Sequence, residues 1–302
     1  MAAVIDDLPS FLDVKQAADY LNLNEKKVYA LVAEGRIPGT KVTGKWMFPR
    51  ELIDRWMLES SHGGLLTDRL VIAGSDDPLL YRVVLNLARD VGSKGLVSYA
   101  PTGTRLGLEL LQANRADVTG MHWGPSEESH LRHPALLSQF SGYRRWVLVR
   151  AFRREQGLMF QPDLPAEFRV EELLKRPLRW AMRQEGAGAK RFFLETLTRL
   201  GTDATALNTT ATALSERDAA SRIALGQADI APGTRSAAAE NGLAFAATGW
   251  ECFDIAMDRS IYFRKLFQDL ITRIQDAETA DLAAMLGGYD LSDAGKLVWG
   301  QD

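Results

Sequence analysis

The sequence predicts an α/β protein in which a small N-terminal helical module precedes a larger α/β domain. Three observations support this prediction. Apolar residues recur at helical spacing in the first part of the chain, a short Ser, His and Gly stretch follows at 60–64, and strand and helix patterns alternate after it. We therefore expect two domains, residues 1–60 and residues 65–302.

The composition is that of a folded globular protein. Hydrophobic residues make up 46% and charged residues 25% of the 302 residues, which is enough to bury a core. The 36 Lys and Arg residues nearly balance the 39 Asp and Glu residues, which excludes a polycation that coats nucleic acid but not a single DNA-binding module. The chain has no long apolar run, no signal-peptide pattern and a single cysteine, Cys252. We expect a cytoplasmic protein that does not contact a membrane.

The N-terminal module contains the signals of three helices and a hairpin. The first helix begins after Asp13, with Gln16 in the position of a capping box, and the second begins after Asn24. A hairpin is predicted around 43–44, and a third helix is predicted after Pro49. The residues expected to face inward are Val14, Ala17, Ala18, Leu21, Val28, Leu31, Val32, Leu52, Ile53, Trp56 and Met57.

Two short helices, a turn, a third helix and a hairpin form a winged helix-turn-helix, whose second helix enters the major groove of DNA. The candidate DNA-binding residues are Lys26, Lys27, Tyr29, Arg36, Lys41, Lys45 and Arg50. Basic side chains bind phosphates or guanine edges, and an exposed tyrosine packs on the DNA backbone. A protein-interaction module is the alternative, because the segment 11–60 is almost electrically balanced, but the positions of the basic residues favour DNA.

Four segments of this module have a recognisable residue pattern. They are FLDVKQAADYL at 11–21, VYAL at 28–31, GRIPG at 35–39 and WMFP at 46–49. In combination they resemble the excisionase-type, MerR-like helix-turn-helix family. The resemblance implies binding to double-stranded DNA. A homodimer or higher homo-oligomer is expected, since one small helix-turn-helix reads only half of a specific site.

The larger domain is predicted to contain parallel βαβ units, because strand and helix patterns alternate along it. The expected strands are 69–73, 95–99, 117–123, 178–182 and 228–231, and the expected helices are 78–89, 104–113, 189–200 and 210–226. Such units place the carboxyl ends of their strands, and any bound ligand, at one edge of the sheet.

Three strand ends, at 74–78, 100–105 and 183–191, carry residues suited to hold an anion. Free N–H groups and the helix dipole favour negative charge where a strand passes into a helix. The candidate ligand-binding residues are Ser75, Asp76, Thr102, Gly103, Thr104, His122, Arg154, Arg183, Gly186, Ala187, Gly188 and Ala189. The alternative for the two arginines is a hinge salt bridge. The alternative for the histidine is a structural, hydrogen-bonded side chain.

Six segments of the larger domain match a known pattern. They are 74–80, 116–122, 153–158, 183–188, 226–231 and 286–290. They resemble a type 2 periplasmic-binding-protein-like α/β domain, and more narrowly the substrate-binding domain described as molybdate-binding. The resemblance implies a two-lobed fold with hinge strands near 146–153 and 253–258, and molybdate or tungstate in the cleft between the lobes.

The sequence departs from that family pattern at two places. The common Gly-Ser-Gly-Thr-Arg is replaced by 186–190, Gly-Ala-Gly-Ala-Lys, which lacks two hydroxyl donors. Asp76 stands where a neutral or basic residue is usual. If Asp76 faces the cleft, it favours a polar organic ligand with an amine or hydroxyl group over a bare oxyanion.

Together these features predict a one-component transcriptional regulator that senses a small polar, anionic ligand, either an oxyanion such as molybdate or tungstate or a small organic anion. The chain contains no HExxH, GxSxG or GxxxxGK[ST] motif, so neither catalysis nor a cofactor is expected. His130 and His133 lie in a predicted polar loop, and no metal site is expected there. Two alternatives stay open: an enzyme or carrier that handles molybdenum cofactor or a related intermediate, and a DNA-binding protein whose cleft has lost its ligand.

Overall fold

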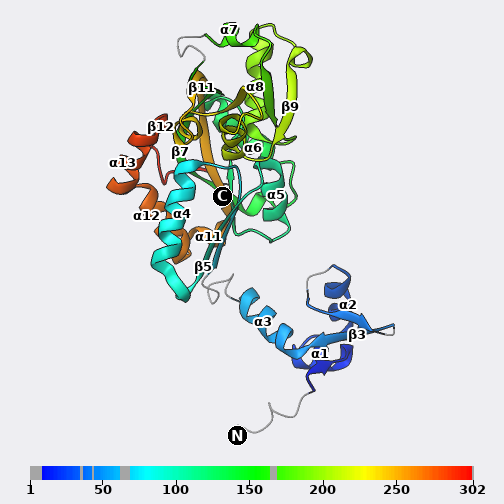
Figure 1. The fold of residues 1–302 in the computed structure, drawn as a ribbon. Helices are drawn as coiled ribbons and strands as arrows, with labels where there is room; N and C mark the ends of the chain where they lie inside the picture. The colour runs from blue at the N-terminus through cyan, green and yellow to red at the C-terminus, as the bar shows by residue number, and fades with distance from the viewer. Residues whose placement is uncertain (1–8, 35–36, 43, 62–68, 164–168, 301–302) are drawn as a thin grey trace. The chain divides into compact units, whose positions relative to one another are not determined.

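The computed structural model describes residues 9–34, 37–42, 44–61, 69–163 and 169–300 (Figure 1). The chain divides into two compact units, Met1–Asp68 and Arg69–Asp302, here named the small unit and the large unit. None of the helices in the described ranges is both long and apolar enough to cross a membrane.

The small unit combines three helices with a three-stranded antiparallel sheet (Figure 1). Its elements are β1 (Phe11–Leu12), α1 (Val14–Tyr20), α2 (Glu25–Ala33), β2 (Thr40–Val42), β3 (Lys45–Pro49) and α3 (Arg50–Ser61). The strand order is β1-β3-β2. The predicted hairpin is therefore confirmed as β2 and β3, and β1 is a further strand that was not predicted.

The predicted starts of the first two helices are confirmed by hydrogen bonds. The Asp13 side chain accepts a bond from the Gln16 backbone N–H (2.8 Å), and the Gln16 side chain accepts one from the Asp13 N–H (3.0 Å). The Asn24 side chain accepts a bond from the Lys27 N–H (2.8 Å). These bonds satisfy N–H groups that have no partner inside the helix. The core they enclose contains Leu12, Val14, Ala17, Ala18, Val28, Leu31, Val32, Ile37, Phe48 and Ile53.

The third helix of the small unit is less buried than predicted. Ile53 is fully buried and Trp56 is half-buried, but Leu52 and Met57 are each 43% exposed. Successive helical residues are about 100° apart, so Leu52 and Met57 lie on the two edges of the apolar stripe. The core of this unit covers only the middle of that stripe.

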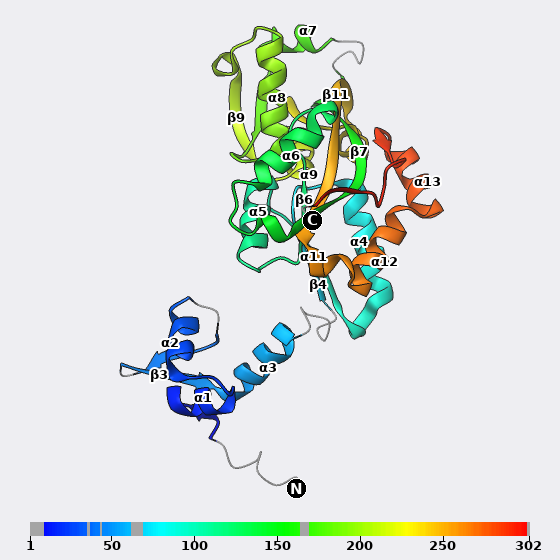
Figure 2. The ribbon, with the colours of Figure 1, turned by 180° about the vertical axis from the view of Figure 1, so that it is seen from behind.

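The large unit is built on a ten-stranded mixed sheet with helices packed on it (Figures 1 and 2). The strands are β4 (Arg69–Gly74), β5 (Leu96–Pro101), β6 (Val118–Met121), β7 (Trp146–Phe160), β8 (Arg179–Arg183), β9 (Asn208–Ala213), β10 (Ile230–Thr234), β11 (Ala244–Asp258), β12 (Tyr289–Asp290) and β13 (Leu297–Gly300). The helices are α4 (Pro78–Val91), α5 (Thr104–Gln112), α6 (Ser129–Leu137), α7 (Val170–Leu174), α8 (Gly188–Arg199), α9 (Glu216–Ala224), α10 (Arg235–Glu240), α11 (Arg259–Tyr262), α12 (Lys265–Ile274) and α13 (Ala277–Leu286).

The sheet divides the large unit into two lobes. Its order is β5-β4-β6-β11-β7-β10-β8-β9, and β12 and β13 also pair with β7. Strand β4 is parallel to β5 and β6, which form the first lobe, and β8 is parallel to β9 and β10, which form the second lobe. The long antiparallel strands β7 and β11 run through both lobes (Figure 2). The predicted parallel βαβ units and the two-lobed α/β fold are confirmed.

The crossing between the lobes lies next to the predicted hinges. Strand β7 pairs with β12 as far as Arg154 and with β10 from Gln156 onward. Strand β11 pairs with β6 from Asp254 onward. The change of partner strands places the crossing between the lobes near Arg154–Gln156 on β7 and near Asp254 on β11. The predicted hinge ranges, 146–153 and 253–258, therefore lie within the first lobe, next to the crossing.

Two predicted elements of the large unit are wrong. The helix expected over 210–226 is strand β9 followed by α9, which begins only after Ser215, whose side chain accepts a bond from the Asp218 N–H (3.0 Å). Three of the six residues of β9 are threonines, which are β-branched and favour strands, and β9 pairs with β8. The loop expected around His130 and His133 is helix α6.

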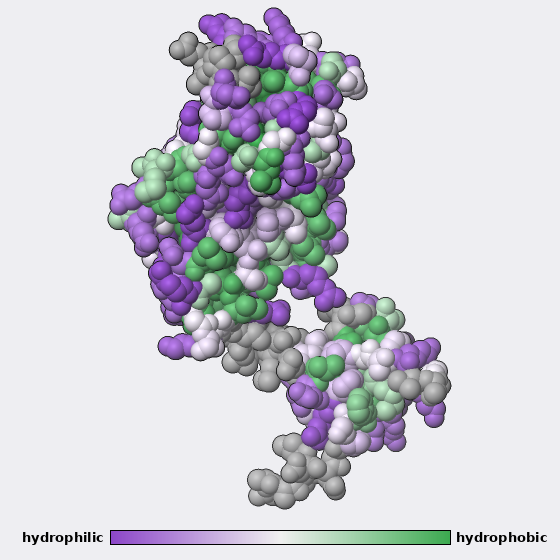
Figure 3. Space-filling view, in the orientation of Figure 1, coloured by the Kyte–Doolittle hydropathy of each residue, from purple (hydrophilic) through white to green (hydrophobic). Residues whose placement is uncertain are grey.

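Each lobe has its own hydrophobic core. In the first lobe, α4, α12 and α13 pack together, and Phe152 and Phe253 stack with ring centroids 5.0 Å apart. In the second lobe, Trp180 stacks on Phe193 at 5.4 Å. The face of the large unit drawn in Figure 3 is mostly hydrophilic, with hydrophobic side chains in separate patches. Two separate cores allow the lobes to move as bodies about the strands that join them.

Candidate functional site

Helix α2 presents the central part of the predicted DNA-binding surface. Lys26, Lys27 and Tyr29 are exposed, and the tyrosine side chain is 50% exposed. They point outward because Val28 and Leu31 on the same helix are buried in the core of the small unit. This division of the helix leaves two positive charges and an aromatic ring free to meet DNA.

The hairpin carries two further candidates. Lys41 and Lys45 are exposed, and Lys41 Nζ lies 5.9 Å from the centroid of the Trp46 ring. Arg50 is half-buried at the start of α3, so it offers less of its side chain to DNA than the lysines do. Arg36 lies outside the described residues.

The predicted ligand-binding turns of the two lobes meet each other. The Gln184 side chain donates a hydrogen bond to the Thr102 carbonyl oxygen (3.0 Å), and the Arg105 backbone N–H donates one to the Gly186 carbonyl oxygen (3.3 Å). Within the first lobe, the Gly103 N–H donates to the Gly74 carbonyl oxygen (2.8 Å). The prediction that these turns lie close together is therefore confirmed.

The start of helix α8 packs directly on the first lobe. Ala187, Gly188 and Ala189 are buried. A Cβ atom on Gly188 would lie 2.3 Å from the His122 carbonyl oxygen, so only glycine fits this close approach. The turn that was expected to cradle an anion is used in part to join the lobes.

Two of the predicted hydroxyl groups bond to each other. Ser75 Oγ and Thr104 Oγ1 lie 2.8 Å apart and either can be the donor, and Thr104 Oγ1 also lies 3.2 Å from the His122 carbonyl oxygen. A hydroxyl has one proton, so at least one of the two protons is used within this pair. The Thr102 hydroxyl accepts a bond from the Gly74 N–H (3.1 Å) and retains its own proton.

Asp76 of the first lobe is tied to Arg217 of the second. Arg217 Nη2 and Nε lie 2.7 and 3.0 Å from Asp76 Oδ1, and the Arg217 backbone N–H donates to Oδ2 at 3.0 Å. The guanidinium also stacks on Tyr81, with 3.8 Å between Arg217 Cζ and the ring centroid. Burial alone would raise the pKa of Asp76, but the bonds from Arg217 outweigh burial and lower it. Asp76 is thus a carboxylate paired with Arg217, which lies in the first turn of α9.

Arg154 is fully buried among three carboxylates. Its Nε donates to Glu251 (2.8 Å), its Nη1 donates to Asp77 (3.0 Å), and its Nη2 lies 3.6 Å from Glu216 Oε1. Burial would lower the pKa of Arg154, and the three carboxylates outweigh burial and raise it. In this structure Arg154 makes internal ion pairs.

Glu251, on β11, accepts hydrogen bonds from two residues of the neighbouring strand β7, Arg154 and Gln156. The Gln156 side chain donates to Glu251 Oε1 (2.7 Å), and His122 Nδ1 lies 2.6 Å from Oε2. Burial alone would raise the pKa of Glu251, but His122 and Arg154 outweigh burial and lower it from 4.5 to about 2. The carboxylate therefore stays charged over the physiological range.

This lowered pKa of Glu251 predicts acid sensitivity of the large unit. The stabilisation is complete above the unfolded-state pKa of 4.5 and is lost as the pH falls toward the folded-state value of about 2. Between pH 7 and pH 3 the group should contribute a loss of about 2 kcal/mol to the free energy of unfolding. Urea unfolding of the parent and of Glu251→Gln at both pH values measures it.

The pKa of Asp77 is shifted in the opposite direction: burial raises it, and Arg154 offsets this only in part. Because Asp77 is present in both the parent and Glu251→Gln, its contribution to the pH dependence cancels when the two proteins are compared. An equal loss of unfolding free energy in the parent and in Glu251→Gln would contradict the prediction.

Arg183 lies beside Glu216 in the second lobe, with Nη1 3.0 Å from Oε1. Both side chains are almost completely buried, at 3% and 1% exposure. Arg183 Nη1 and Arg154 Nη2 both lie in ion-pair range of Glu216 Oε1, but these atoms and Glu216 Oε2 form no hydrogen bond within the described part of the chain. We name the following residues the inter-lobe charge cluster: Asp76, Asp77, His122, Arg154, Arg183, Glu216, Arg217 and Glu251.

Four members of this cluster were not among the predicted ligand-binding residues: Asp77, Glu216, Arg217 and Glu251. Glu216 and Arg217 were assigned to the interior of a helix, although the Ser215-x-x-Asp218 pattern, a helix-start signal, marks where α9 begins. Glu251 bonds to a residue 97 positions away. No local pattern can reveal a partner at that separation.

His133 has a structural role. Its Nδ1 lies 2.7 Å from Asp254 Oδ2, and its Nε2 accepts a bond from the Trp123 N–H (3.1 Å), so both ring nitrogens are engaged. Among the residues that the structure describes, no group of three or more His, Cys, Asp or Glu side chains is placed to hold a metal ion.

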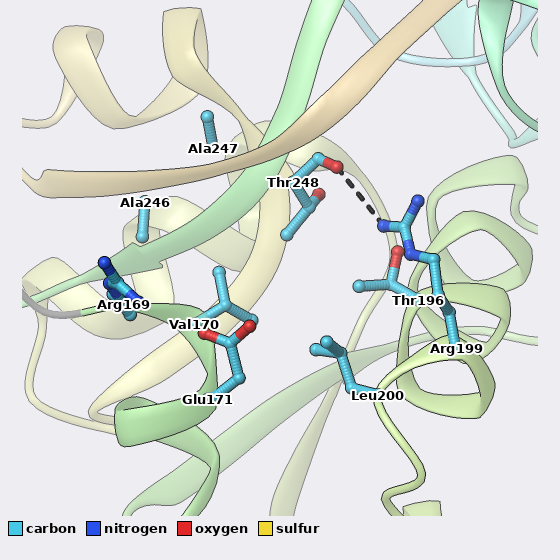
Figure 4. A pocket seen from close by; sticks show the side chains of 9 residues that line it. All are labelled: Arg169, Val170, Glu171, Thr196, Arg199, Leu200, Ala246, Ala247 and Thr248. Carbon is cyan, nitrogen blue, oxygen red and sulfur yellow. Dashed lines mark hydrogen bonds between the residues drawn. The ribbon is translucent and has the colours of Figure 1, made fainter.

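A separate pocket of about 310 Å³ lies in the second lobe (Figure 4). It is lined by Arg169, Val170, Glu171, Thr196, Arg199, Leu200, Ala246, Ala247 and Thr248. Arg199 Nη2 donates to the Thr248 carbonyl oxygen (3.4 Å) at its edge. None of the predicted ligand-binding residues lines this pocket, so it is distinct from the inter-lobe charge cluster.

The fold and the site define a helix-turn-helix unit joined to a two-lobed unit of the periplasmic-binding-protein type. Residues 86–275 match the family described as PBP superfamily domain, and residues 11–61 match the family described as helix-turn-helix domain. The first match spans more than half of the chain, so the chain belongs to the PBP superfamily domain family. No curated protein matches the sequence significantly.

Several solved structures share the fold. A mutant of OxyR from Corynebacterium glutamicum, bound to hydrogen peroxide, is 16% identical, with 90% of each chain covered and a TM-score of 0.54. A Clostridium perfringens protein described as a phosphate ABC transporter substrate-binding protein, with bound phosphate, is 12% identical, covering 74% of this chain and all of that chain at a TM-score of 0.52. PhnD1 from Prochlorococcus marinus, in complex with methylphosphonate, is 12% identical, covering 76% of this chain and 93% of that chain at 0.50.

Proposed function

We propose that the protein is a one-component transcriptional regulator, in which the small unit binds duplex DNA and the large unit senses a small polar ligand that carries an acid group. The observation that carries this proposal is the presence, in one chain, of a helix-turn-helix with an exposed basic recognition helix and a two-lobed binding fold. A regulator of this kind acts in the cytoplasm and works by binding rather than by catalysis.

The DNA-binding mode that we propose follows the excisionase-type, MerR-like family. Helix α2 enters the major groove and the β2–β3 hairpin lies on neighbouring phosphates. Exposed Lys26 and Lys27 on α2, and Lys41 and Lys45 on the hairpin, support this mode because they can replace phosphate counterions.

The ligand is proposed to act on the contact between the lobes. Asp76 and Arg217 belong to different lobes, and ligand entry among the buried charges requires the lobes to separate. A ligand that binds one arrangement of the lobes better than the other shifts their equilibrium, which can change how two DNA-binding units are spaced. No described feature of the site favours the alternative of an enzyme or carrier for molybdenum cofactor.

A thermal-shift screen of the full chain against oxyanions and small polar metabolites tests the sensing function. A ligand at one hundred times its Kd should stabilise the protein by about 2.7 kcal/mol. At least one compound is expected to raise the melting temperature of the large unit. If none does while DNA still binds, the protein is a DNA-binding protein without a sensor function.

We expect the protein to be at least a dimer on DNA, because one helix-turn-helix contacts only a half-site. Helix α12 cannot supply the interface with its apolar face, which is buried in the first lobe. Phe263 and Met285 are 74% and 80% exposed and are the candidates nearby. Light scattering of the full chain with and without DNA measures the mass. A monomer in both states contradicts this prediction.

A further inference from the structure

The pocket of the second lobe has a buried, mostly apolar base. Val170 and Ala246 are each 9% exposed, and Thr196 is 4% exposed. The Thr196 hydroxyl donates its one proton to the Phe192 carbonyl oxygen (3.0 Å), so it has no proton left for a ligand. The volume of about 310 Å³ is roughly twice that of a cavity that holds one benzene molecule. The base therefore suits an apolar body of about six to ten carbon atoms.

The rim of this pocket is charged. Arg169, Glu171 and Arg199 are exposed, and Figure 4 shows the two arginines at opposite ends of the pocket with Glu171 between them. Two guanidinium groups against one carboxylate give the rim a net charge of +1. A ligand with one negative charge neutralises this rim, whereas a neutral or cationic ligand does not.

The arginines are the side-chain hydrogen-bond donors that the pocket offers to a ligand. Arg199 Nη2 donates to the Thr248 carbonyl oxygen (3.4 Å), and the other N–H groups of Arg199 make no hydrogen bond with the described residues. The Arg169 side chain has no hydrogen bond or ion pair with them either. The Thr248 hydroxyl, in contrast, donates its proton to the Gln156 carbonyl oxygen (3.0 Å). The pocket therefore calls for a negatively charged acceptor.

We propose that this pocket binds a small carboxylic acid with an apolar body of about six to ten carbon atoms. The ligand carboxylate accepts charge-assisted hydrogen bonds from Arg199, whose bond to Thr248 holds the guanidinium at the edge of the pocket. The apolar body lies on Val170, Leu200 and Ala246. The site is separate from the inter-lobe charge cluster, because its lining residues lie in the second lobe, and it does not depend on the sensing function proposed above.

Calorimetry of the full chain with hexanoate, octanoate and phenylacetate tests the proposal. At least one of these acids should bind. The amide of that acid, which has the same shape but no charge, should bind at least about 10-fold more weakly. Acetate, which keeps the carboxylate but lacks the apolar body, should bind at least about 100-fold more weakly. These comparisons use the parent protein and need no variant.

Matched variants then locate the site. Arg199→Ala should weaken the acid about 10-fold and its amide by less than about 3-fold, because only the acid uses the charge. Ala246→Leu fills the base of the pocket and should weaken both compounds at least about 10-fold. Arg191→Ala removes another exposed arginine of α8, outside the pocket, and should bind as the parent does. Circular dichroism establishes folding, and the exposed position of Arg199 keeps the test valid if Ala246→Leu unfolds.

Three results would overturn this proposal: none of the three acids binds, the amide binds as tightly as its acid, or the acid keeps its parent affinity in Arg199→Ala. The last result places the acid at another site of the chain. DNA binding and the thermal-shift screen are measured separately, so the failure of this pocket is distinguishable from the failure of the regulator.

Discussion

Replacing Lys26 and Lys27 together by alanine should weaken binding of the full chain to duplex DNA about 30-fold at physiological salt. Both side chains are exposed on α2, and neither supports the core of the small unit. Each lysine that contacts a phosphate releases a counterion, so the double variant should also reduce the slope of log affinity against log salt by about 2. Fluorescence anisotropy at several salt concentrations measures both quantities.

The control for this experiment removes the same charge elsewhere. Lys265→Ala/Lys296→Ala changes two exposed lysines of the large unit and should leave DNA affinity unchanged. The loss in the α2 variant should be similar for every DNA sequence, because phosphates carry no sequence information. A double variant that binds with the parent's affinity and salt slope would remove α2 from the DNA interface.

Replacing Arg154 by methionine should lower the free energy of unfolding of the large unit by about 3–5 kcal/mol, because removing one partner of a buried ion pair leaves uncompensated charge. Glu251 and Asp77 would lose their guanidinium partner while fully buried. Methionine retains much of the packing volume of arginine, so the loss of unfolding free energy measures the unpaired charge more than the effect of a cavity. Urea unfolding followed by tryptophan fluorescence measures it, with Trp180 buried in the second lobe.

Arg153 provides the matched control on the same strand. Its side chain is 39% exposed and pairs with Asp290 at 2.6 Å. Arg153→Met should cost less than about 1 kcal/mol, since exposed ion pairs contribute little. Equal losses in the two variants would show that burial of the charge cluster does not govern the stability of the large unit.

The helix starts of the small unit could be predicted because their signals are local. A capping residue and its partner lie three positions apart, as Asp13 and Gln16 do. The meeting of the turns around Thr102 and Gly186 could also be predicted, since parallel strands place their carboxyl ends together.

The partners of the site residues could not be predicted, because they come from distant parts of the chain. Asp76 pairs with a residue 141 positions away, and Arg154 and Glu251 lie on different strands. Sequence patterns place backbone turns, but which charges face one another depends on how the lobes pack. Only the structure reveals that the Ser75 and Thr104 hydroxyls bond to each other and that Glu216 pairs with Arg183.

The central claim, that one chain couples DNA binding to a small ligand, is tested most directly by DNA affinity with and without ligand. The duplex is one enriched by the full chain from a random pool, and the ligand is the compound that gives the largest shift in the thermal-shift screen. We expect saturating ligand to change the Kd for this duplex at least about 5-fold, and saturating duplex to change the ligand's Kd by the same factor. Failure to enrich any duplex, or a Kd that is the same with and without ligand, would contradict the claim.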